Sequence, residues 1–420
     1  MDIIISPTSF NGSFTAPPSK SAAHRIIIFA ALSKKPVSFP LAEISEDIDA
    51  TINCLRALGA SITWDSKILH ITPIEQSTPA QSPLLDCKES GSTLRFLLPL
   101  AAILAQAPSF IGSGRLPARP ILHILEAMAS HGISASASKL PVTLRGMLTP
   151  GTYVLPGDVS SQYITGLLLS LPLLPADSKL MISTPLASGG YVALTLELLQ
   201  LFGIEIHQAK NTFYIPGKQQ YRAPQQLSIE GDWSNAAFFL SAGAINGKIR
   251  CHALATDSKQ KDSLLLSILQ KMGAIVVAKD DSLQVCADAL HGISVNMSEI
   301  PDLLPILGVL GAAAEGKTVL YNAARTRIKE SDRLYTTATM LRQLGVATEE
   351  KEDSLTIWGG NRFQSCSIDS FGDHRIAMAA CIAAGFAAAP ITVTNVTAIN
   401  KSYPSFLNTF QTLGGNYREI

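Results

Sequence analysis

The chain has little charge and no excess of either sign. Charged residues make up 16% of its 420 residues, where about 25% is typical, and 33 Lys and Arg balance 33 Asp and Glu. Non-specific nucleic-acid binding needs a basic excess, so we expect no nucleic-acid partner. Because 47% of the residues are apolar, the composition excludes a disordered chain and predicts extensive burial.

Cysteine is scarce and follows no recognisable pattern. The six cysteines form no C-x-x-C pair, which argues against a zinc site and a disulfide scaffold and fits a reducing, cytoplasmic compartment. No basic segment followed by an apolar one opens the chain, so we expect no secretory signal. Neither a G-x-G-x-x-G sequence nor a metal-like spacing of His and carboxylates occurs, so neither NAD nor a metal is indicated.

One uncharged run, residues 376–393, approaches the length of a membrane span. It is mostly Ala, contains Gly385 and meets Pro390 before its end, and it begins directly after Asp373-His374-Arg375. These features favour a buried helix of a globular domain, so we expect no membrane partner.

A repeat of about 70 residues runs through the sequence. An amphipathic helical pattern that closes on an apolar residue and Gly recurs, and one copy is irregular because His131 precedes its glycine. Successive glycines are 73, 71, 70, 72 and 69 residues apart. Glycine just past a helix is the expected left-handed cap. The six glycines are Gly59, Gly132, Gly203, Gly273, Gly345 and Gly414.

A second helical series lies between the first and shares its period. Each member starts with small or polar residues and continues apolar on nearly every side, as a core helix does. The members begin near Ser21, Ser92, Ser161, Ser234, Asp302 and Asp373. Such helices recur by chance in any α/β protein, but two interleaved series with one period favour six units, arranged as two domains of three that divide near residue 224.

Cations gather where these helices begin, and helix starts suit anions because their backbone N–H groups are unpaired. This favours a site for polyanions such as two phosphates, or a phosphate and a carboxylate. Ser160 and Ser161 are also ordinary N-cap residues, and the cations of residues 327–333 could be a solvated face paired with Glu330 and Asp332. The cations are Lys20, Arg25, Arg95, Arg119, Arg327, Lys329, Arg333, Arg375 and Lys401.

Taken together, these motifs resemble those of the EPSP synthase (3-phosphoshikimate 1-carboxyvinyltransferase) family. They span the chain in the family's order, and their combination is specific where each alone would be weak. The motifs are PSKSAAHR (Pro18–Arg25), ESGSTLRF (Glu89–Phe96), VSSQYITGLL (Val159–Leu168), RIKESDRL (Arg327–Leu334), FGDHRIAM (Phe371–Met378) and INKSYP (Ile399–Pro404).

The resemblance implies an α/β (α+β) fold of two similar domains, an inverse α/β barrel or prism, with the active site in the cleft between them. Each domain is built from three βαβαββ units. One domain is expected to span residues 14–224 and the other residues 1–13 plus 225–420, with hinge strands near 13–14 and 224–226.

The implied reaction moves the enolpyruvyl group of phosphoenolpyruvate to the 5-hydroxyl of shikimate 3-phosphate and releases phosphate. It proceeds by addition and elimination through a tetrahedral intermediate and serves the synthesis of chorismate and aromatic amino acids. The resemblance implies no cofactor and no metal, two anionic small-molecule substrates as the partners, and a monomeric enzyme.

The resemblance also assigns site residues. The candidate base is Asp302, and the candidate acid is Glu330 with Lys20. The positions for shikimate 3-phosphate are Lys20, Ser21, Arg25, Ser160, Ser161, Gln162, Ser188, Tyr191, Asp302 and Lys329. The positions for phosphoenolpyruvate are Lys20, Gly91, Arg95, Arg119, Gln162, Arg333, Arg375 and Lys401.

Two positions depart from the family pattern. Glu89 puts a carboxylate near an expected anion site, where it either pairs with a cation or points away, and Arg325 replaces an Asn. The alternatives are the sister enzyme UDP-N-acetylglucosamine 1-carboxyvinyltransferase and a non-catalytic phosphosugar-binding protein of the same fold. The sister enzyme has K-N at its first helix and a loop cysteine, whereas this chain has Lys20-Ser21 and no cysteine in residues 113–119.

Overall fold

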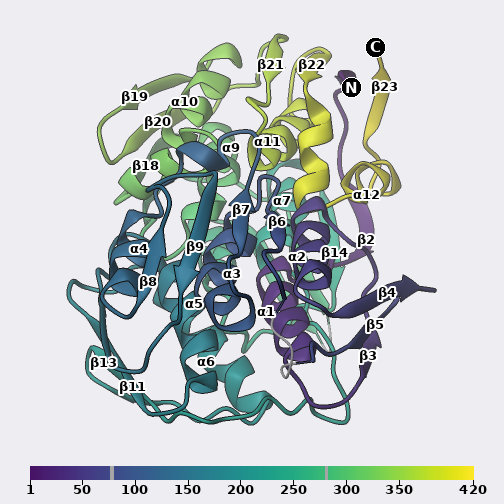
Figure 1. Cartoon of the computed structure of the whole chain (residues 1–420). Coiled ribbons are helices and arrows are strands. Elements are labelled where there is room, and N and C mark those ends of the chain that lie inside the picture. The colour runs from purple at the N-terminus through teal and green to yellow at the C-terminus, as the bar shows by residue number, and fades with distance from the viewer. Residues whose placement is uncertain (76–79, 280–281) are drawn as a thin grey trace. The chain divides into compact units, whose positions relative to one another are not determined.

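The chain folds into two compact units. The computed structural model describes residues 1–75, 80–279 and 282–420 (Figure 1). We call Pro18–Ile229 the amino-terminal unit, and Met1–Pro17 together with Glu230–Ile420 the carboxyl-terminal unit. The expected boundaries at 13–14 and 224–226 lie a few residues earlier in the chain, and the hinge assigned to them stays a prediction.

Helices and strands alternate through the amino-terminal unit. Its helices are α1 (Lys20–Ala31), α2 (Glu46–Ala57), α3 (Gly91–Leu104), α4 (Leu122–Ala129), α5 (Ser161–Ser170) and α6 (Gly189–Leu201), with 3-10 turns η1 (Leu116–Ala118) and η2 (Leu171–Leu173). Its strands are β3 (Val37–Pro40), β4 (Ser61–Asp65), β5 (Ile68–Thr72), β6 (Leu84–Asp86), β7 (Ser109–Ile111), β8 (Ile133–Ala135), β9 (Val142–Gly146), β10 (Thr152–Leu155), β11 (Ser178–Ile182), β12 (His207–Ala209) and β13 (Thr212–Ile215).

Three sheets in this unit follow one plan. Their orders among the described residues are β3-β5-β4, β6-β7-β9-β8 and β10-β11-β13-β12. In the two larger sheets the first pair of strands is parallel and the remaining pairs are antiparallel. The parallel pairs are joined by α3 and α5, which contact each other and belong to the core cluster of the unit.

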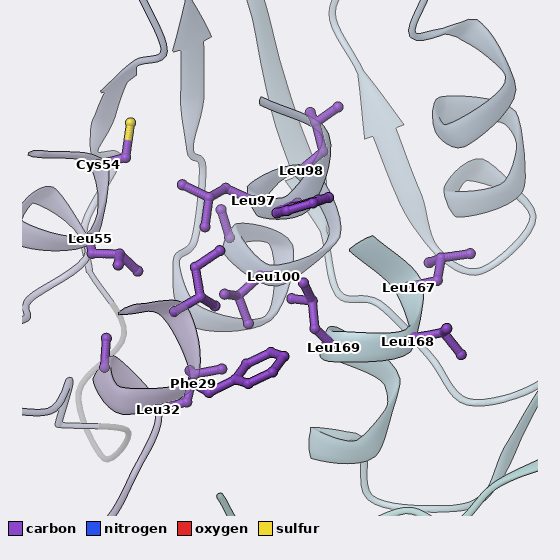
Figure 2. Packing of buried hydrophobic residues seen from close by; sticks show 14 of the residues in the cluster. Phe29, Leu32, Cys54, Leu55, Leu97, Leu98, Leu100, Leu167, Leu168 and Leu169 are labelled. Atoms are coloured by element: carbon purple, nitrogen blue, oxygen red, sulfur yellow. The ribbon is translucent and has the colours of Figure 1, made fainter. Parts of the chain in front are cut away.

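The core of the amino-terminal unit is built by helices that are buried on almost all sides. Phe29 of α1, Leu97 and Leu100 of α3 and Leu169 of α5 are fully buried and converge on one apolar cluster (Figure 2). Since each of these three helices is buried on almost every face, none of them could be stable at a surface. Their polar starts are therefore held in place by a rigid apolar body.

The carboxyl-terminal unit repeats the same elements. Its helices are α7 (Trp233–Asn246), α8 (Leu265–Met272), α9 (Leu304–Ala313), α10 (Arg333–Gln343), α11 (His374–Gly385) and α12 (Phe406–Thr412), with 3-10 turns η3 (Lys261–Leu264), η4 (Pro301–Leu303), η5 (Ala324–Ile328) and η6 (Val396–Lys401). Its strands are β1 (Ile3–Ser6), β2 (Asn11–Thr15), β14 (Lys248–His252), β15 (Ile275–Lys279), β16 (Ser282–Cys286), β17 (Ser294–Asn296), β18 (Gly316–Tyr321), β19 (Ala347–Glu350), β20 (Leu355–Gly359), β21 (Ser367–Asp369), β22 (Ile391–Thr394) and β23 (Asn416–Glu419).

The amino-terminal strands complete two sheets of this unit. The sheet orders are β15-β16-β14-β2, β17-β18-β20-β19 and β21-β22-β1-β23. Strand β2 runs parallel to β14, and β1 pairs antiparallel with both β22 and β23. Residues 1–13, which the resemblance assigns to the second domain, thus form strands beside residues from 248 to 419. Helices α7, α9 and α11 contact one another within the core.

The repeat predicted from the sequence is confirmed. The buried helices begin at or within three residues of the six predicted starts, and serine or aspartate side chains cap five of them: Ser19, Ser90, Ser160, Asp232 and Asp373. The fifth buried helix is entered through η4 instead, so Asp302 lies in a 3-10 turn before α9. All six repeat glycines have positive φ, between 75° and 110°, as left-handed caps require.

The uncharged run of residues 376–393 is divided between two elements. Most of it belongs to α11, which is buried throughout and ends at Gly385, and the rest leads into β22. Of the helices in the described residues, none is both long enough and apolar enough to cross a membrane.

Candidate active site

Most of the candidate residues in the amino-terminal unit lie at the starts of α1, α3, α5 and α6. We call them the amino-terminal cluster: Lys20, Ser21, Arg25, Gly91, Arg95, Arg119, Ser160, Ser161, Gln162, Ser188 and Tyr191. The residues of this cluster are connected through α5, which contacts both Arg25 and Arg95. Gln162 in the first turn of α5 binds Arg95, and Thr165 one turn later binds Arg25.

Arg25 is the most deeply buried cation of this cluster, with 2% of its surface exposed. Its Nε donates to Thr195 Oγ1 at 2.8 Å, and its Nη1 donates to the backbone oxygen of Ser21 at 2.6 Å. Its Nη2 donates to Thr165 Oγ1 at 3.3 Å and to the backbone oxygen of Tyr191 at 3.2 Å. The guanidinium also lies 4.9 Å from the centroid of the Phe96 ring.

All of these acceptors are neutral, so the charge of Arg25 is not cancelled. Among the described residues no carboxylate is paired with it. Burial lowers the pKa of Arg25 to about 10, which expresses the cost of keeping the charge away from water. A buried cation of this kind favours an anionic ligand.

Two further guanidinium groups lie over the start of α3. A Cβ added to Gly91 would sit 2.6 Å from Arg95 Nη1 and 2.8 Å from Arg119 Nη1, so only glycine leaves room for both. Arg95 donates to Gln162 Oε1 at 2.8 Å, and Gln162 Nε2 donates to Ser92 Oγ at 2.9 Å. Two arginines beside a helix amino terminus are a combination that suits an anion.

The serines of the cluster have mixed roles. Ser160 Oγ accepts the backbone N–H of Gln162 at 3.3 Å, so the expectation of an ordinary N-cap is correct for this residue. Ser188, which precedes α6, has left-handed backbone angles of φ 56° and ψ 44° and is 2% exposed. A left-handed serine costs of order 1 kcal/mol or more, and such strain concentrates at functional sites.

Lys20 is held by a residue that the sequence did not single out. Its Nζ lies 2.7 Å from Asp47 Oδ2, and both side chains are mostly buried. Asp47 stands in the first turn of α2, where acidic residues are common for helix stability alone. No motif marks Asp47, so nothing in the sequence separates this carboxylate from a structural one.

The candidate residues of the carboxyl-terminal unit form a second group, which we call the carboxyl-terminal cluster. They come from η4, from the segment leading into α10, from the start of α11 and from η6. The members are Asp302, Lys329, Glu330, Arg333, Arg375 and Lys401, and the structure adds Asp373.

Arg333 lies at the centre of this cluster and is 1% exposed. It contacts three carboxylates: Asp302 at 2.6 Å, Glu330 at 2.6 Å and Asp373 at 2.8 Å. Although burial would lower the pKa of Arg333, these carboxylates raise it above the ordinary value. Asp373 also accepts the backbone N–H of Arg375 at 2.9 Å and so ties Arg333 to the start of α11.

Asp302 is surrounded by three cations. Its carboxylate lies 2.6 Å from Arg333 Nη1, 3.3 Å from Arg375 Nη2 and 3.4 Å from Lys329 Nζ. Burial would raise the pKa of Asp302, but the cations outweigh it and hold the pKa well below its usual range. Burial has the opposite effect on Lys329, whose pKa is lowered despite the attraction of Asp302.

Lys401 is 8% exposed and lies at the end of η6. Its Nζ donates to the backbone oxygen of Gly372 at 2.7 Å, in the turn that precedes α11. This contact places a third cation, after Arg333 and Arg375, beside the same helix start.

The structure shows where the positions that sequence reasoning left open lie. Arg327 does lie in an ion-pair group, with Asp332 and Glu350, but the partner Glu350 comes from β19 and was not foreseen. The carboxylate of Glu89 packs against Gly114, since a Cβ on that glycine would overlap it. Arg325 lies in η5, close enough to Lys329 to help lower its pKa.

Residues 311–318 read G-A-A-A-E-G-K-T and match the P-loop signature. A functional P-loop follows a strand and opens a helix, so that the helix start faces the phosphates. Here the order is reversed, because the segment leaves the end of α9 and enters β18. The match is therefore accidental and gives no nucleotide site.

The arrangement supports proton transfer and anion binding. The carboxylates of Asp302 and Glu330 contact cations, and Arg25, Arg95 and Arg119 lie within or next to the first two turns of helices. In the part of the chain that the structure describes, no group of three or more His, Cys, Asp and Glu residues is arranged to hold a metal ion.

Comparison with known proteins supports one family. Residues 4–410 match the family model for EPSP synthase (3-phosphoshikimate 1-carboxyvinyltransferase). The chain is 40% identical over 425 residues to a 3-phosphoshikimate 1-carboxyvinyltransferase of Clostridium novyi (strain NT), covering 99% of this chain and 98% of that protein. It is 41% identical over 421 residues to the enzyme of that name from Clostridium acetobutylicum, with the same shares covered.

The solved structures agree with the sequence relatives. The chain superposes on EPSP synthase from Acinetobacter baumannii with a TM-score of 0.84 and 25% identity, and each chain is covered completely. The enolpyruvyl transferase NikO from Streptomyces tendae has the same fold, with a TM-score of 0.78 at 17% identity over 99% of this chain and 98% of that one. The expected two-domain α/β fold is thereby confirmed.

Proposed function

Because the chain belongs to the EPSP synthase (3-phosphoshikimate 1-carboxyvinyltransferase) family, we propose that its two clusters supply the substrate contacts and the proton transfers of that family's reaction. The protein is a transferase of the shikimate pathway that moves the enolpyruvyl group of phosphoenolpyruvate to shikimate 3-phosphate. The single observation that carries the proposal is the position of Asp302, a carboxylate within 3.4 Å of three cationic side chains.

Shikimate 3-phosphate is a hydroxylated ring with a phosphate and a carboxylate, so it needs both cations and hydroxyl partners. We assign it to residues that combine these groups. The assigned residues are Lys20, Ser21, Arg25, Ser160, Ser161, Gln162, Ser188, Tyr191, Asp302 and Lys329. The uncancelled charge of Arg25 and the strained backbone of Ser188 support this assignment.

Phosphoenolpyruvate carries a phosphate and a carboxylate on a three-carbon unit, and its binding calls for guanidinium groups. We assign it to Lys20, Gly91, Arg95, Arg119, Gln162, Arg333, Arg375 and Lys401. The guanidinium groups of Arg95 and Arg119 fill the space that a side chain at Gly91 would need, which supports the assignment of these three residues. The gathering of Arg333, Arg375 and Lys401 around the start of α11 supports the assignment of those three.

In the proposed chemistry Asp302 accepts the proton of the 5-hydroxyl of shikimate 3-phosphate, while the oxygen of that hydroxyl bonds to C2 of phosphoenolpyruvate. Glu330, with Lys20, delivers a proton to C3, which gives a tetrahedral intermediate. In the elimination the new methyl group on C3 returns a proton to the enzyme. The bond from C2 to the phosphate oxygen breaks, the C2–C3 double bond forms again, and phosphate leaves. Each proton-transfer group contributes typically ~10²–10⁴-fold to the rate.

The cations around Asp302 give substrate binding a second role. In the free protein they hold the pKa of Asp302 well below its usual range, which makes it a weak base. Anionic substrates that bind to Lys329, Arg333 and Arg375 would share these charges and raise the pKa of the carboxylate. Asp302 would thereby become a stronger base when the substrates arrive.

The reaction itself is tested by phosphate release. Purified protein with phosphoenolpyruvate and shikimate 3-phosphate should release phosphate without added metal or nucleotide, and omission of either substrate should stop the release. Replacement of shikimate 3-phosphate by UDP-N-acetylglucosamine is the control for the sister activity. Equal release with that sugar nucleotide would overturn the substrate assignment, and binding without release would leave a phosphosugar-binding protein.

A further inference from the structure

Arg25 is a point where three helices of the amino-terminal unit are tied together. It belongs to α1, and its guanidinium contacts Thr165 of α5, together with Thr195 and the backbone oxygen of Tyr191 on α6. We propose that Thr165 and Thr195 are positioning residues that hold Arg25 as an uncancelled cation for the anionic substrate. The inference rests on the proposed function, since it takes shikimate 3-phosphate as the anion.

The hydroxyl groups can be assigned donor and acceptor roles without conflict. Thr195 donates to the backbone oxygen of Tyr191 at 2.7 Å, which leaves its lone pairs for Arg25 Nε at 2.8 Å and for the Thr165 hydroxyl at 3.0 Å. Thr165 then donates to Thr195 and accepts from Arg25 Nη2 at 3.3 Å. Both threonines are fully buried, so water does not replace either partner.

The acceptors that hold Arg25 are neutral, which leaves its positive charge for a ligand. A carboxylate in place of either threonine would fix Arg25 equally well, but it would cancel the charge. Four of the five N–H groups of the guanidinium donate to acceptors in the protein. The fifth, on Nη1, has no acceptor among the described residues. The side chain is thereby fixed in place and still has its charge and one donor for a substrate.

A purely structural explanation makes a different prediction. Buried threonines in helices often donate to the carbonyl four residues earlier, as Thr195 does to Tyr191. If that were their whole role, removal of the hydroxyl would change stability and leave substrate affinity as it was. The two explanations therefore separate on binding and not on folding.

The test uses the full chain and four variants. Thr195→Val and Thr165→Val remove the hydroxyl at nearly constant shape, and Thr195→Ser restores it. Thr318→Val is the matched control, since Thr318 is also a buried threonine, 1% exposed, in the carboxyl-terminal unit. The measurements are kcat, KM for each substrate from phosphate release, the dissociation constant of shikimate 3-phosphate, and the thermal unfolding midpoint.

For Thr195→Val we expect KM and the dissociation constant for shikimate 3-phosphate to rise ~10-fold, as when a hydrogen bond to a charged group is lost, with kcat changed less than about threefold. Thr165→Val should act in the same direction but more weakly, because its hydrogen bond is longer. Thr195→Ser should return to within about twofold of wild type, and Thr318→Val should keep wild-type constants.

Wild-type affinity in a folded Thr195→Val protein would overturn the proposal, and so would an equal loss in Thr318→Val. If Thr195→Val does not fold, the same criteria apply to Thr165→Val. Failure of the proposed function is recognised separately, because the wild-type protein itself would then bind no shikimate 3-phosphate or release no phosphate.

Discussion

Two buried arginines, one in each cluster, have surroundings of opposite kinds, neutral for Arg25 and anionic for Arg333. Arg25 is 2% exposed and donates to hydroxyl and carbonyl oxygens, whereas Arg333 is 1% exposed and contacts the carboxylates of Asp302, Glu330 and Asp373. Burial therefore lowers the pKa of the first, while the carboxylates raise the pKa of the second.

This difference indicates a division of labour. Neutral partners leave the charge of Arg25 for a ligand, so the amino-terminal cluster is suited to hold anions. In the carboxyl-terminal cluster the cations, besides the anion binding proposed for them, lie beside carboxylates and shift their pKa values, which suits proton transfer.

Asp302→Asn should lower kcat by ~10²-fold or more, because the amide cannot accept the hydroxyl proton. The fold should survive, which circular dichroism can verify. The control is Glu349→Gln, which neutralises an exposed carboxylate whose one ion-pair partner among the described residues is Lys351, at 3.5 Å. Turnover of the Asp302 variant at the level of that control would mean that the base lies elsewhere.

Gly91→Ala should raise KM for phosphoenolpyruvate by ~10-fold or more. The added Cβ would meet Arg95 and Arg119 at 2.6 and 2.8 Å, so both guanidinium groups must move away from the start of α3. The dissociation constant of shikimate 3-phosphate is the internal control and should change little. A larger loss for shikimate 3-phosphate than for phosphoenolpyruvate would contradict the assignment of this group.

Lys329→Met should shift the acid limb of kcat/KM toward higher pH. Lys329 is one of the cations that favour the charged form of Asp302, so its removal raises the pKa of that carboxyl group. The carboxylate is then protonated, and activity lost, at a higher pH as the solution is acidified. The pH–rate profiles of both proteins are the measurement, and coincident acid limbs would contradict the expected coupling.

His24 should make stability depend on pH in a small but measurable way. It is fully buried beside Thr51, and burial, with Lys20 and Arg25, lowers its pKa well below the ordinary value of ~6.5. The unfolded chain binds this proton more readily, so stability is present above pH ~6.5 and is lost as the pH falls below it.

The slope is at most about 1.4 kcal/mol per pH unit for one group. Urea unfolding at pH 7.5 and 5.5 would measure it, with His24→Asn as the matched variant that cannot titrate. We expect a smaller difference between the two pH values in the variant. Equal differences would show that His24 does not carry this dependence.

The sequence predicted the helix starts well, because local chemistry marks them. Ser90 and Asp373 cap the helices that follow them. The period of about 70 residues indicated which apolar runs are helices. The left-handed glycine caps, such as Gly273 at φ 110°, were likewise recognisable from a single residue in context.

The partners of the charged groups could not be predicted in the same way. Thr195 is 170 residues from Arg25 in the chain, and Asp47 is 27 residues from Lys20. A threonine inside a helix and an aspartate in a first turn are common for purely structural reasons. Their roles depend on which helices meet, and only the folded chain provides that information.

The division of labour is tested most directly by the dissociation constant of shikimate 3-phosphate in two charge-changing variants, Arg25→Gln and Asp302→Asn. We predict that Arg25→Gln weakens binding by ~10²-fold, because an uncancelled buried cation is lost. Asp302→Asn should bind within about threefold of wild type although its turnover collapses, because the amide oxygen can still accept a hydrogen bond from the 5-hydroxyl and removal of a negative charge does not repel an anion. Similar losses of affinity in both variants, or a loss confined to Asp302→Asn, would contradict the account.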